Sequence, residues 1–298
     1  MNITNRITIL FRLLRPQQWL KNIFVLLPLF FGGALLQQAP LLQALIAFIS
    51  FCMVASAIYC LNDVVDAPAD RLHDIKRHRP VASGAVTTRQ ALSIAAILTL
   101  AAIALPMTLP QTGWKVAAVI TAYALINIAY CLWIKQIAVL DVCVIAFGFV
   151  MRLIAGSTAT DIPLSHWIVL MTFLLTLFMA LSKRRDDVLK YDNTGIIIRK
   201  NITRYNITFL NQAITITATI TIVCYIMYTV SPEVTQRFHN TYIYLTSLPV
   251  IIGILRYIQL TIVDGKSGSP THIMLHDTFL QIVLLLWTLS FFIILYVL

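Results

Sequence analysis

The sequence predicts an all-α membrane protein with nine transmembrane helices, its N-terminus in the cytoplasm and its C-terminus outside. The first reason is composition: 59% of the 298 residues are hydrophobic and only 11% are charged, whereas soluble proteins carry about 25% charged residues. The second is that uncharged stretches of about 20 residues or more, enough to span a bilayer, recur along the chain. The third is that basic residues collect in alternate connecting segments. A soluble or disordered chain is therefore excluded.

The predicted helices follow from these uncharged stretches in order. Within segment 1–21, apolar residues at helical spacing interleave with arginines, which predicts an interfacial helix; a frayed tail is the alternative. Stretch 22–62 is about twice the length of one span and contains Gly32, Gly33 and Pro40, so it predicts two helices joined by a turn. Six other predicted spans lie within the uncharged stretches 90–114, 116–134, 162–182, 205–232, 238–255 and 278–298, and 141–159 adds another although it contains Arg152.

The positions of the charges explain the net charge of +10. With the N-terminus inside, every Lys and Arg except Lys115, Arg152 and Arg237 falls in a cytoplasmic segment. All acids except Asp161 and Glu233 do the same. This asymmetry is typical of the positive-inside topology, and it favours membrane lipids over nucleic acid as the partner.

The acids concentrate at the end of the second predicted helix, in segment 62–70. Its three aspartates are spaced i, i+3 and i+7, so they lie on one helix face. Carboxylates this close repel one another and need a cation. Mg²⁺ prefers one or two carboxylates together with phosphate oxygens, and Lys76 and Arg79 follow within reach of the same anion. The predicted metal ligands are Asn62, Asp63, Asp66 and Asp70, and the three aspartates are the predicted catalytic residues.

Two other interpretations of segment 62–70 remain. One is a solvated loop of mixed charge just beyond a helix end. The other is a proton or ion relay in a transporter, which predicts acids near mid-helix and an internal inverted repeat. We find no such repeat, and the acids lie at the cytoplasmic end of the predicted helix.

Segment 62–70 resembles the first aspartate-rich motif of the UbiA-type intramembrane prenyltransferase superfamily, and the resemblance covers nearly the whole chain. It implies nine helices around a central cavity and Mg²⁺-dependent departure of pyrophosphate. Segments 15–22, 130–135, 141–156 and 181–184 are similar to the decaprenyl-phosphate phosphoribosyltransferase branch. That branch transfers 5-phosphoribose from phosphoribosyl pyrophosphate to a polyprenyl phosphate, a step toward sugar donors for the cell envelope.

The same resemblance implies one domain, 1–298, in a bacterial cytoplasmic membrane with its active site facing the cytoplasm. Cytoplasmic segments 63–89, 183–204 and 256–277 are expected to carry the site. Turn 264–270 is interpreted as a connector, with a lid over the ribose as the alternative.

Segment 182–192 bears on the choice between branches of the superfamily. Aromatic prenyltransferases of the superfamily usually carry a second pair of aspartates, four residues apart, at this place, and no pair here has that spacing. Lys183 and Arg184 instead suit a donor with an additional 5-phosphate, because both supply charged hydrogen bonds to phosphate. The alternative function is transfer of a prenyl group from a prenyl diphosphate to an aromatic or quinone-precursor acceptor.

The remaining candidate residues line the expected cytoplasmic side. The resemblance implies substrate contacts for Lys21 and Asn22. Arg152, a charge within a predicted span, is expected to face the interior, where it contacts substrate or pairs with a polar group of another helix. Tyr130 and Lys135 flank a short turn and either bind donor phosphate or anchor the interface. Lys21, Arg152 or Lys135 is expected to hold the acceptor phosphate.

Overall fold

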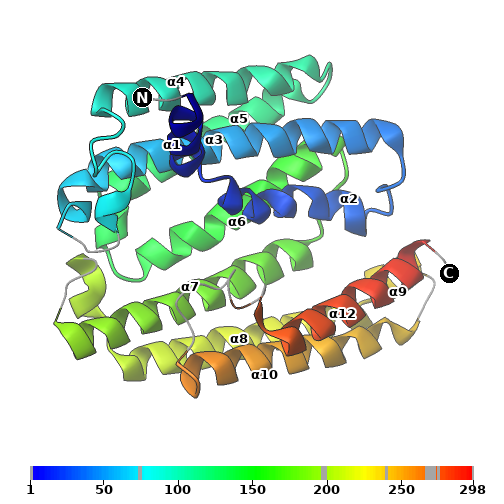
Figure 1. Cartoon of the computed structure of the whole chain (residues 1–298). Helices are drawn as coiled ribbons and strands as arrows, with labels where there is room; N and C mark the ends of the chain where they lie inside the picture. Colours follow the sequence, from blue (N-terminus) through cyan, green and yellow to red (C-terminus); the bar gives the residue numbers. More distant parts are fainter. Residues whose placement is uncertain are drawn as a thin grey trace. The chain divides into compact units, whose positions relative to one another are not determined.

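The computed structural model describes residues 3–72, 76–195, 200–238, 241–265, 273 and 276–296, and within these ranges it is helical and without strands (Figure 1). Most of the predicted turn 264–270 lies outside the described residues. The α-helices are α1 (Ile3–Leu14), α2 (Leu27–Phe31), α3 (Gln38–Asp70), α4 (Thr88–Ala104), α5 (Gly113–Leu132), α6 (Leu140–Thr160), α7 (His166–Thr194), α8 (Ile207–Val230), α9 (Pro232–Phe238), α10 (Ser247–Ile262) and α12 (Thr278–Tyr296). The 3₁₀ helices are η1 (Pro16–Leu26), η2 (Lys76–His78), η3 (Leu105–Thr108), η4 (Ile134–Gln136), η5 (Lys200–Arg204) and η6 (Thr241–Thr246).

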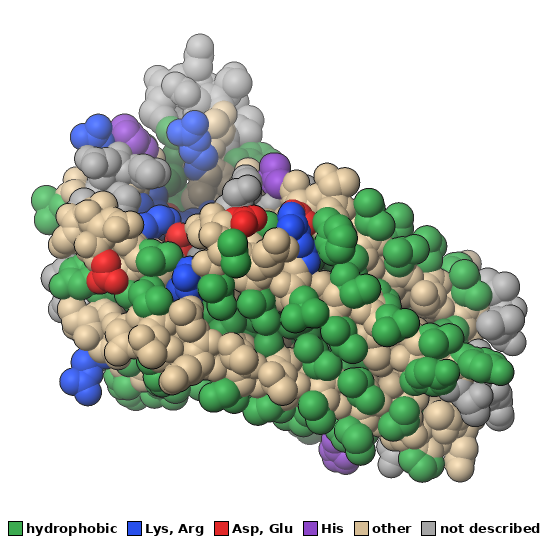
Figure 2. All heavy atoms as spheres, turned by 90° about the horizontal axis from the view of Figure 1, so that it is seen from below, with side chains coloured by type: hydrophobic (Ala, Val, Ile, Leu, Met, Phe, Trp, Pro, Cys, Tyr) green, Lys and Arg blue, Asp and Glu red, His purple; other side chains and the backbone are tan. Residues whose placement is uncertain are grey.

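Seven helical segments of the described chain are long and apolar enough to cross a membrane. They are Gln38–Asp70, Thr88–Thr108, Gly113–Leu132, Leu140–Thr160, His166–Thr194, Ile207–Val230 and Tyr242–Ile262, and Thr278–Ile294 is a shorter apolar helix. Large apolar side chains lie on the outside of several of them, for example Leu100 at 68% and Ile216 at 58% exposure. Figure 2 shows such side chains over much of the visible face. The chain is therefore a multi-pass membrane protein.

The first predicted span differs from an ordinary α-helix. Residues Pro16–Leu26 form a 3₁₀ helix, which α2 extends to Phe31. A 3₁₀ helix rises about 2.0 Å per residue, so these two elements together extend for about 30 Å, close to the thickness of the hydrocarbon core. Gly33, with a φ of 70°, adopts the left-handed conformation that glycine tolerates, and the chain turns there before α3.

Helices α3 and α7 continue beyond the apolar runs from which the spans were predicted. With 33 residues, α3 is about 50 Å long, well beyond the hydrocarbon core of about 30 Å. Residues 63–70 and 183–194, expected to begin cytoplasmic loops, are therefore helical. In the sequence, an apolar run ends at its first charged residue. The helix does not end there, because backbone hydrogen bonding continues through charged residues.

One compact unit comprises Met1–Lys135 and Gly148–Leu164. In it, α4 and α5 pack against α3, and η1 lies along α3 as well (Figure 1). Its largest core cluster joins Val25 of η1, Phe51 of α3, Ile120 of α5 and Ala155 of α6. These contacts hold the middle of α3, and a second cluster, which includes Cys60 and Ala67, packs around its C-terminal end, where the acidic residues lie.

The close approach of α6 to η1 requires glycine at position 156. A Cβ atom built on Gly156 would lie 1.8 Å from the Val25 carbonyl oxygen. We expect Gly156→Ala to destabilise the protein by about 1–3 kcal/mol or more, because the obstacle is backbone. The measurement is the thermal denaturation midpoint in detergent. Gly148→Ala, on the same helix, is the control, since its Cβ would meet nothing closer than 3.6 Å; equal midpoints for the two variants would contradict the expectation.

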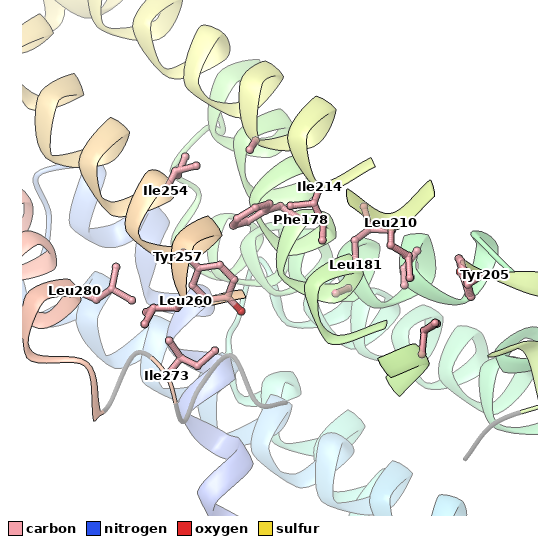
Figure 3. Packing of buried hydrophobic residues seen from close by; sticks show 14 of the residues in the cluster. Phe178, Leu181, Tyr205, Leu210, Ile214, Ile254, Tyr257, Leu260, Ile273 and Leu280 are labelled. Atoms are coloured by element: carbon pink, nitrogen blue, oxygen red, sulfur yellow. The ribbon is translucent and has the colours of Figure 1, made fainter. Parts of the chain in front are cut away.

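The second compact unit comprises Gln136–Phe147 and Ser165–Leu298. In it, α7 packs on α8, α8 on α10, and α10 on α12. Figure 3 shows Phe178 of α7, Leu210 and Ile214 of α8, and Tyr257 of α10 in its core. The Phe178 and Tyr257 ring centroids are 5.2 Å apart. This apolar core includes Leu181 and Val188 of α7, between which the basic Ser182–Arg185 run lies.

Candidate active site

The predicted acidic face of α3 lies in the first unit. Asp63 and Asp70 are 1% and 4% exposed. The guanidinium of Arg79 contacts both carboxylates. Its Nη1 donates to Oδ2 of Asp70 at 2.7 Å and lies 3.6 Å from Oδ1 of Asp63. Arg15 also forms an ion pair with Asp63. The i, i+7 spacing thus does bring two buried carboxylates to a common cation.

Asp66 is the more accessible aspartate of the motif. Its side chain is 31% exposed and accepts from Nζ of Lys135 at 2.5 Å. Its second oxygen accepts from Nδ2 of Asn62 at 2.9 Å, one helical turn earlier. The structure therefore brings together Lys135 and Asn62, which the sequence analysis assigned separately to phosphate and metal binding.

The donor set fits a hard divalent cation. Oδ2 of Asp63 is buried and has no hydrogen-bond partner among the described residues. Carboxylate oxygens are the ligands that Mg²⁺ prefers, usually one or two of them with substrate phosphate oxygens. Within the described ranges, no three His, Cys, Asp or Glu side chains form a metal-binding group. A site of one or two carboxylates completed by substrate does not need three.

Arg152 occupies a buried polar position in the first unit, with 6% exposure. Its Nε donates to Oδ1 of Asn22 at 2.8 Å, and its Nη2 donates to the Tyr123 hydroxyl at 3.0 Å. Its guanidinium carbon lies 5.0 Å from the Tyr123 ring centroid. In the part of the chain that the structure describes, no carboxylate pairs with Arg152, so its charge is balanced only by dipoles and aromatic faces.

Asn22 and Lys21 lie next to this guanidinium. Asn22 is fully buried and, besides accepting from Arg152, donates to Sγ of Cys52 at 3.2 Å, so it orients Arg152. Lys21 lies near the like charges of Arg152 and Arg15. Cations held this close together favour binding of an anion. A direct substrate contact by Asn22 stays a prediction.

Arg184 lies in the second unit and is only 1% exposed. Its Nε donates to Oδ2 of Asp141 at 2.8 Å, and its Nη1 pairs with Asp187. The Tyr205 hydroxyl donates to Oδ1 of Asp141 at 2.7 Å and accepts from the Val139 N–H at 2.6 Å. This buried network gives Asp141 and Asp187 structural partners that the sequence did not reveal. Phosphate contacts by Lys183 and Arg184 stay predictions.

Two other arginines of the second unit stabilise helix ends, one directly and one through an aspartate. Arg185 donates from Nη1 to the Thr261 carbonyl at 2.7 Å, at the C-terminal end of α10. Arg256 donates to Oδ2 of Asp277 at 2.8 Å, while Oδ1 of Asp277 accepts from the Leu280 N–H at 2.9 Å at the start of α12. Their basic character in the sequence therefore has a structural explanation.

The last predicted contacts and one missed residue belong to the first unit. Tyr130 lies in the last turn of α5, and Lys76 begins η2; both are half-buried. Sequence reasoning missed Arg15 as a site residue, although it pairs with Asp63. Its only signal was its place at the start of the 15–22 segment.

Comparison with known proteins assigns the family. The sequence profile of the UbiA prenyltransferase family matches residues 25–274. The chain belongs to the UbiA prenyltransferase family. It is therefore a membrane transferase.

Several relatives of this UbiA family member carry the same name. It is 36% identical over 293 residues to the decaprenyl-phosphate phosphoribosyltransferase of Mycolicibacterium smegmatis, covering 95% of this chain and 91% of the relative. It is 36% identical over 276 residues to the enzyme of that name from Corynebacterium glutamicum, covering 92% and 82% of the two chains. The fold resembles a UbiA homologue from Archaeoglobus fulgidus bound to DMAPP and Mg²⁺, with a TM-score of 0.71, 20% identity and coverage of 97% and 99%.

Proposed function

We propose that this protein transfers 5-phosphoribose from phosphoribosyl pyrophosphate to a polyprenyl phosphate of the decaprenyl type and releases pyrophosphate. The observation that carries the proposal is the end of α3, where buried carboxylates lie among Arg15, Arg79 and Lys135. The carboxylates can bind a metal ion and the cations can bind phosphate, so this set of charges suits a substrate that carries phosphate together with a metal ion. The names of relatives that match nearly the whole chain support the choice of donor and acceptor. The products suit the building of cell-envelope sugar donors.

The proposed cofactor is Mg²⁺, and the solved neighbour bound to Mg²⁺ supports this choice. The residues that would hold it are Asn62, Asp63, Asp66 and Asp70. Bound there, it would supply positive charge that stabilises the departing pyrophosphate. Lys76 and Arg79 are proposed to neutralise the remaining phosphate charge, as fixed cations do in phosphoryl and glycosyl chemistry.

In the proposed reaction, the bond from C1 of the ribose to the pyrophosphate oxygen breaks, and an oxygen of the lipid phosphate forms a new bond to C1. The carbon passes through an oxocarbenium-like state. The acceptor phosphate has a second pKa of about 6, so it is already ionised at neutral pH and needs no strong general base. Lys21 and Arg152 are proposed to hold this phosphate. The proposal also includes substrate contacts by four further residues, Tyr130, Lys135, Lys183 and Arg184.

The proposed topology has nine spans, with the N-terminus inside, the C-terminus outside and the active site facing the cytoplasm of a bacterial inner membrane. The seven long apolar segments, together with η1–α2 and α12, supply nine. The distribution of Lys and Arg supports the orientation.

The proposed phosphate contact of Lys21 is tested by substitution. Lys21→Gln removes the ammonium charge, so we expect the KM for polyprenyl phosphate to rise about tenfold or more. Lys21→Arg keeps the positive charge and should stay closer to wild type. Steady-state kinetics in nanodiscs measure both variants. A wild-type KM in Lys21→Gln would refute the assignment to Lys21.

The function is tested by incubating the purified protein in lipid nanodiscs with Mg²⁺, phosphoribosyl pyrophosphate labelled in the ribose, and decaprenyl phosphate. We expect the label to enter the lipid fraction and pyrophosphate to appear in equal amount. An unlabelled lipid fraction, with consumption of a prenyl diphosphate and an aromatic acceptor in parallel reactions, would instead establish a prenyltransferase acting on aromatic or quinone precursors.

A further inference from the structure

A cavity of about 370 Å³ and one of about 260 Å³ open on the described chain, and the smaller one adjoins the acidic motif. The larger has no charged lining residue. The smaller lies within the first unit, and its lining comprises three arginines, one histidine, one aspartate and one proline. They are Arg12, Arg15, Asp63, His78, Arg79 and Pro80. Positive charge therefore predominates in a cavity that contains the first aspartate of the motif.

Apolar packing and a hydrogen bond both fix the end of α1, next to which two of the arginines lie. Leu13 is fully buried in a cluster with Cys60 of α3 and Val81, so the end of α1 is fixed against both. Arg12 and Arg15 lie on either side of this anchor. The Leu14 carbonyl accepts from the Ser56 hydroxyl at 2.8 Å, which ties the same turn to α3.

Arg15 adopts an unusual backbone conformation at this turn. Its φ of 52° and ψ of 57° lie in the left-handed region, which costs a residue with a Cβ atom about 1 kcal/mol or more. The turn leaves its guanidinium paired with Asp63 and 5.1 Å from the Tyr59 ring centroid. Packing around Leu13 offsets this strain and keeps the guanidinium at the cavity.

The charges of the cavity are not balanced within the protein. Arg15 and Arg79 share Asp63, and Arg79 also pairs with Asp70. Arg12 forms no ion pair with any residue that the structure describes. Three guanidinium groups, those of Arg12, Arg15 and Arg79, thus face the two carboxylates of Asp63 and Asp70. One positive charge is left in excess, which favours binding of an anion.

We infer that this cavity is a subsite for a phosphate monoester, built from Arg12, Arg15 and His78 beside the predicted metal-binding residues. The inference rests on the proposed function. Phosphoribosyl pyrophosphate carries such a monoester at C5, and polyprenyl phosphate carries one as its headgroup. A prenyl diphosphate and free pyrophosphate carry none. The subsite would therefore select phosphorylated sugar chemistry over ordinary prenyl transfer.

The test compares Arg12→Gln with wild type in the full-length protein in nanodiscs with Mg²⁺. Calorimetry measures binding of phosphoribosyl pyrophosphate, ribose 5-phosphate, decaprenyl phosphate and inorganic pyrophosphate. Loss of a charged hydrogen bond costs about tenfold or more in affinity. We expect that loss for ribose 5-phosphate and phosphoribosyl pyrophosphate if the subsite holds the donor, or for decaprenyl phosphate if it holds the acceptor. Pyrophosphate binding should change less than twofold. Arg89→Gln, an exposed arginine outside the cavity, is the matched control.

The other outcomes would contradict either the subsite alone or the proposed function as well. If wild type binds phosphoribosyl pyrophosphate but Arg12→Gln affects none of the four ligands, or weakens pyrophosphate equally, the monoester subsite is wrong and the proposed function stands. If wild type neither binds nor transfers from phosphoribosyl pyrophosphate, both are wrong.

Discussion

Asp66→Asn is expected to lower the turnover number for phosphoribosyl transfer by about 10²-fold or more. The substitution keeps the shape of the side chain and removes its charge, so the amide becomes a poor ligand for Mg²⁺ and a poor partner for Lys135. Removing a single group that stabilises charge in a transition state typically costs two to three orders of magnitude. The measurement is transfer of labelled ribose to lipid under saturating substrates.

Asp66 is the best position for this test because its side chain is 31% exposed, so folding depends less on it than on Asp63 or Asp70. The denaturation midpoint should stay within a few degrees of wild type. Asp192→Asn, an exposed aspartate at the end of α7, is the matched control and should keep full turnover. Wild-type turnover in Asp66→Asn, with an unchanged Mg²⁺ requirement, would remove Asp66 from the mechanism.

The parts of this site that were predictable from sequence are local. Helical periodicity was enough to place Asp63, Asp66 and Asp70 on one face, because that spacing depends only on 3.6 residues per turn. The cations that complete the site come from distant segments: Arg15 is 48 residues from Asp63, and Lys135 is 69 residues from Asp66. No periodicity relates such residues, so only the packing of η1 and α5 against α3 reveals their pairing.

In the fold, too, local features were predictable from the sequence and contacts between distant residues were not. Apolar runs indicated where helices cross the membrane, since burying backbone in lipid demands helical hydrogen bonding. They misjudged the first span, because counting residues assumes an α-helical rise and Pro16–Leu26 is a 3₁₀ helix. Arg152 was correctly expected to face the interior, but its partner Asn22 lies 130 residues away and could not be read from the sequence.

Arg184→Gln is expected to destabilise the protein by about 3–5 kcal/mol, because it leaves Asp141 and Asp187 without their buried cation. Asp141 is fully buried, so without Arg184 its charge would depend on weaker partners such as the Tyr205 hydroxyl. Thermal denaturation in detergent measures the loss, and Arg204→Gln, at an exposed arginine of η5, is the control. A midpoint equal to that of the control would show that the buried network contributes little.

A rescue variant separates this structural effect from the phosphate contact predicted for Arg184. Combining Arg184→Met with Asp141→Asn and Asp187→Asn removes all three charges, and replacing a whole buried ionic group often restores stability. We expect the triple variant to recover most of the denaturation midpoint. If it also recovers transfer, Arg184 acts only through packing. If stability returns while the KM for phosphoribosyl pyrophosphate remains raised about tenfold or more, the guanidinium also binds substrate, because a neutral side chain restores folding but cannot donate charged hydrogen bonds to phosphate.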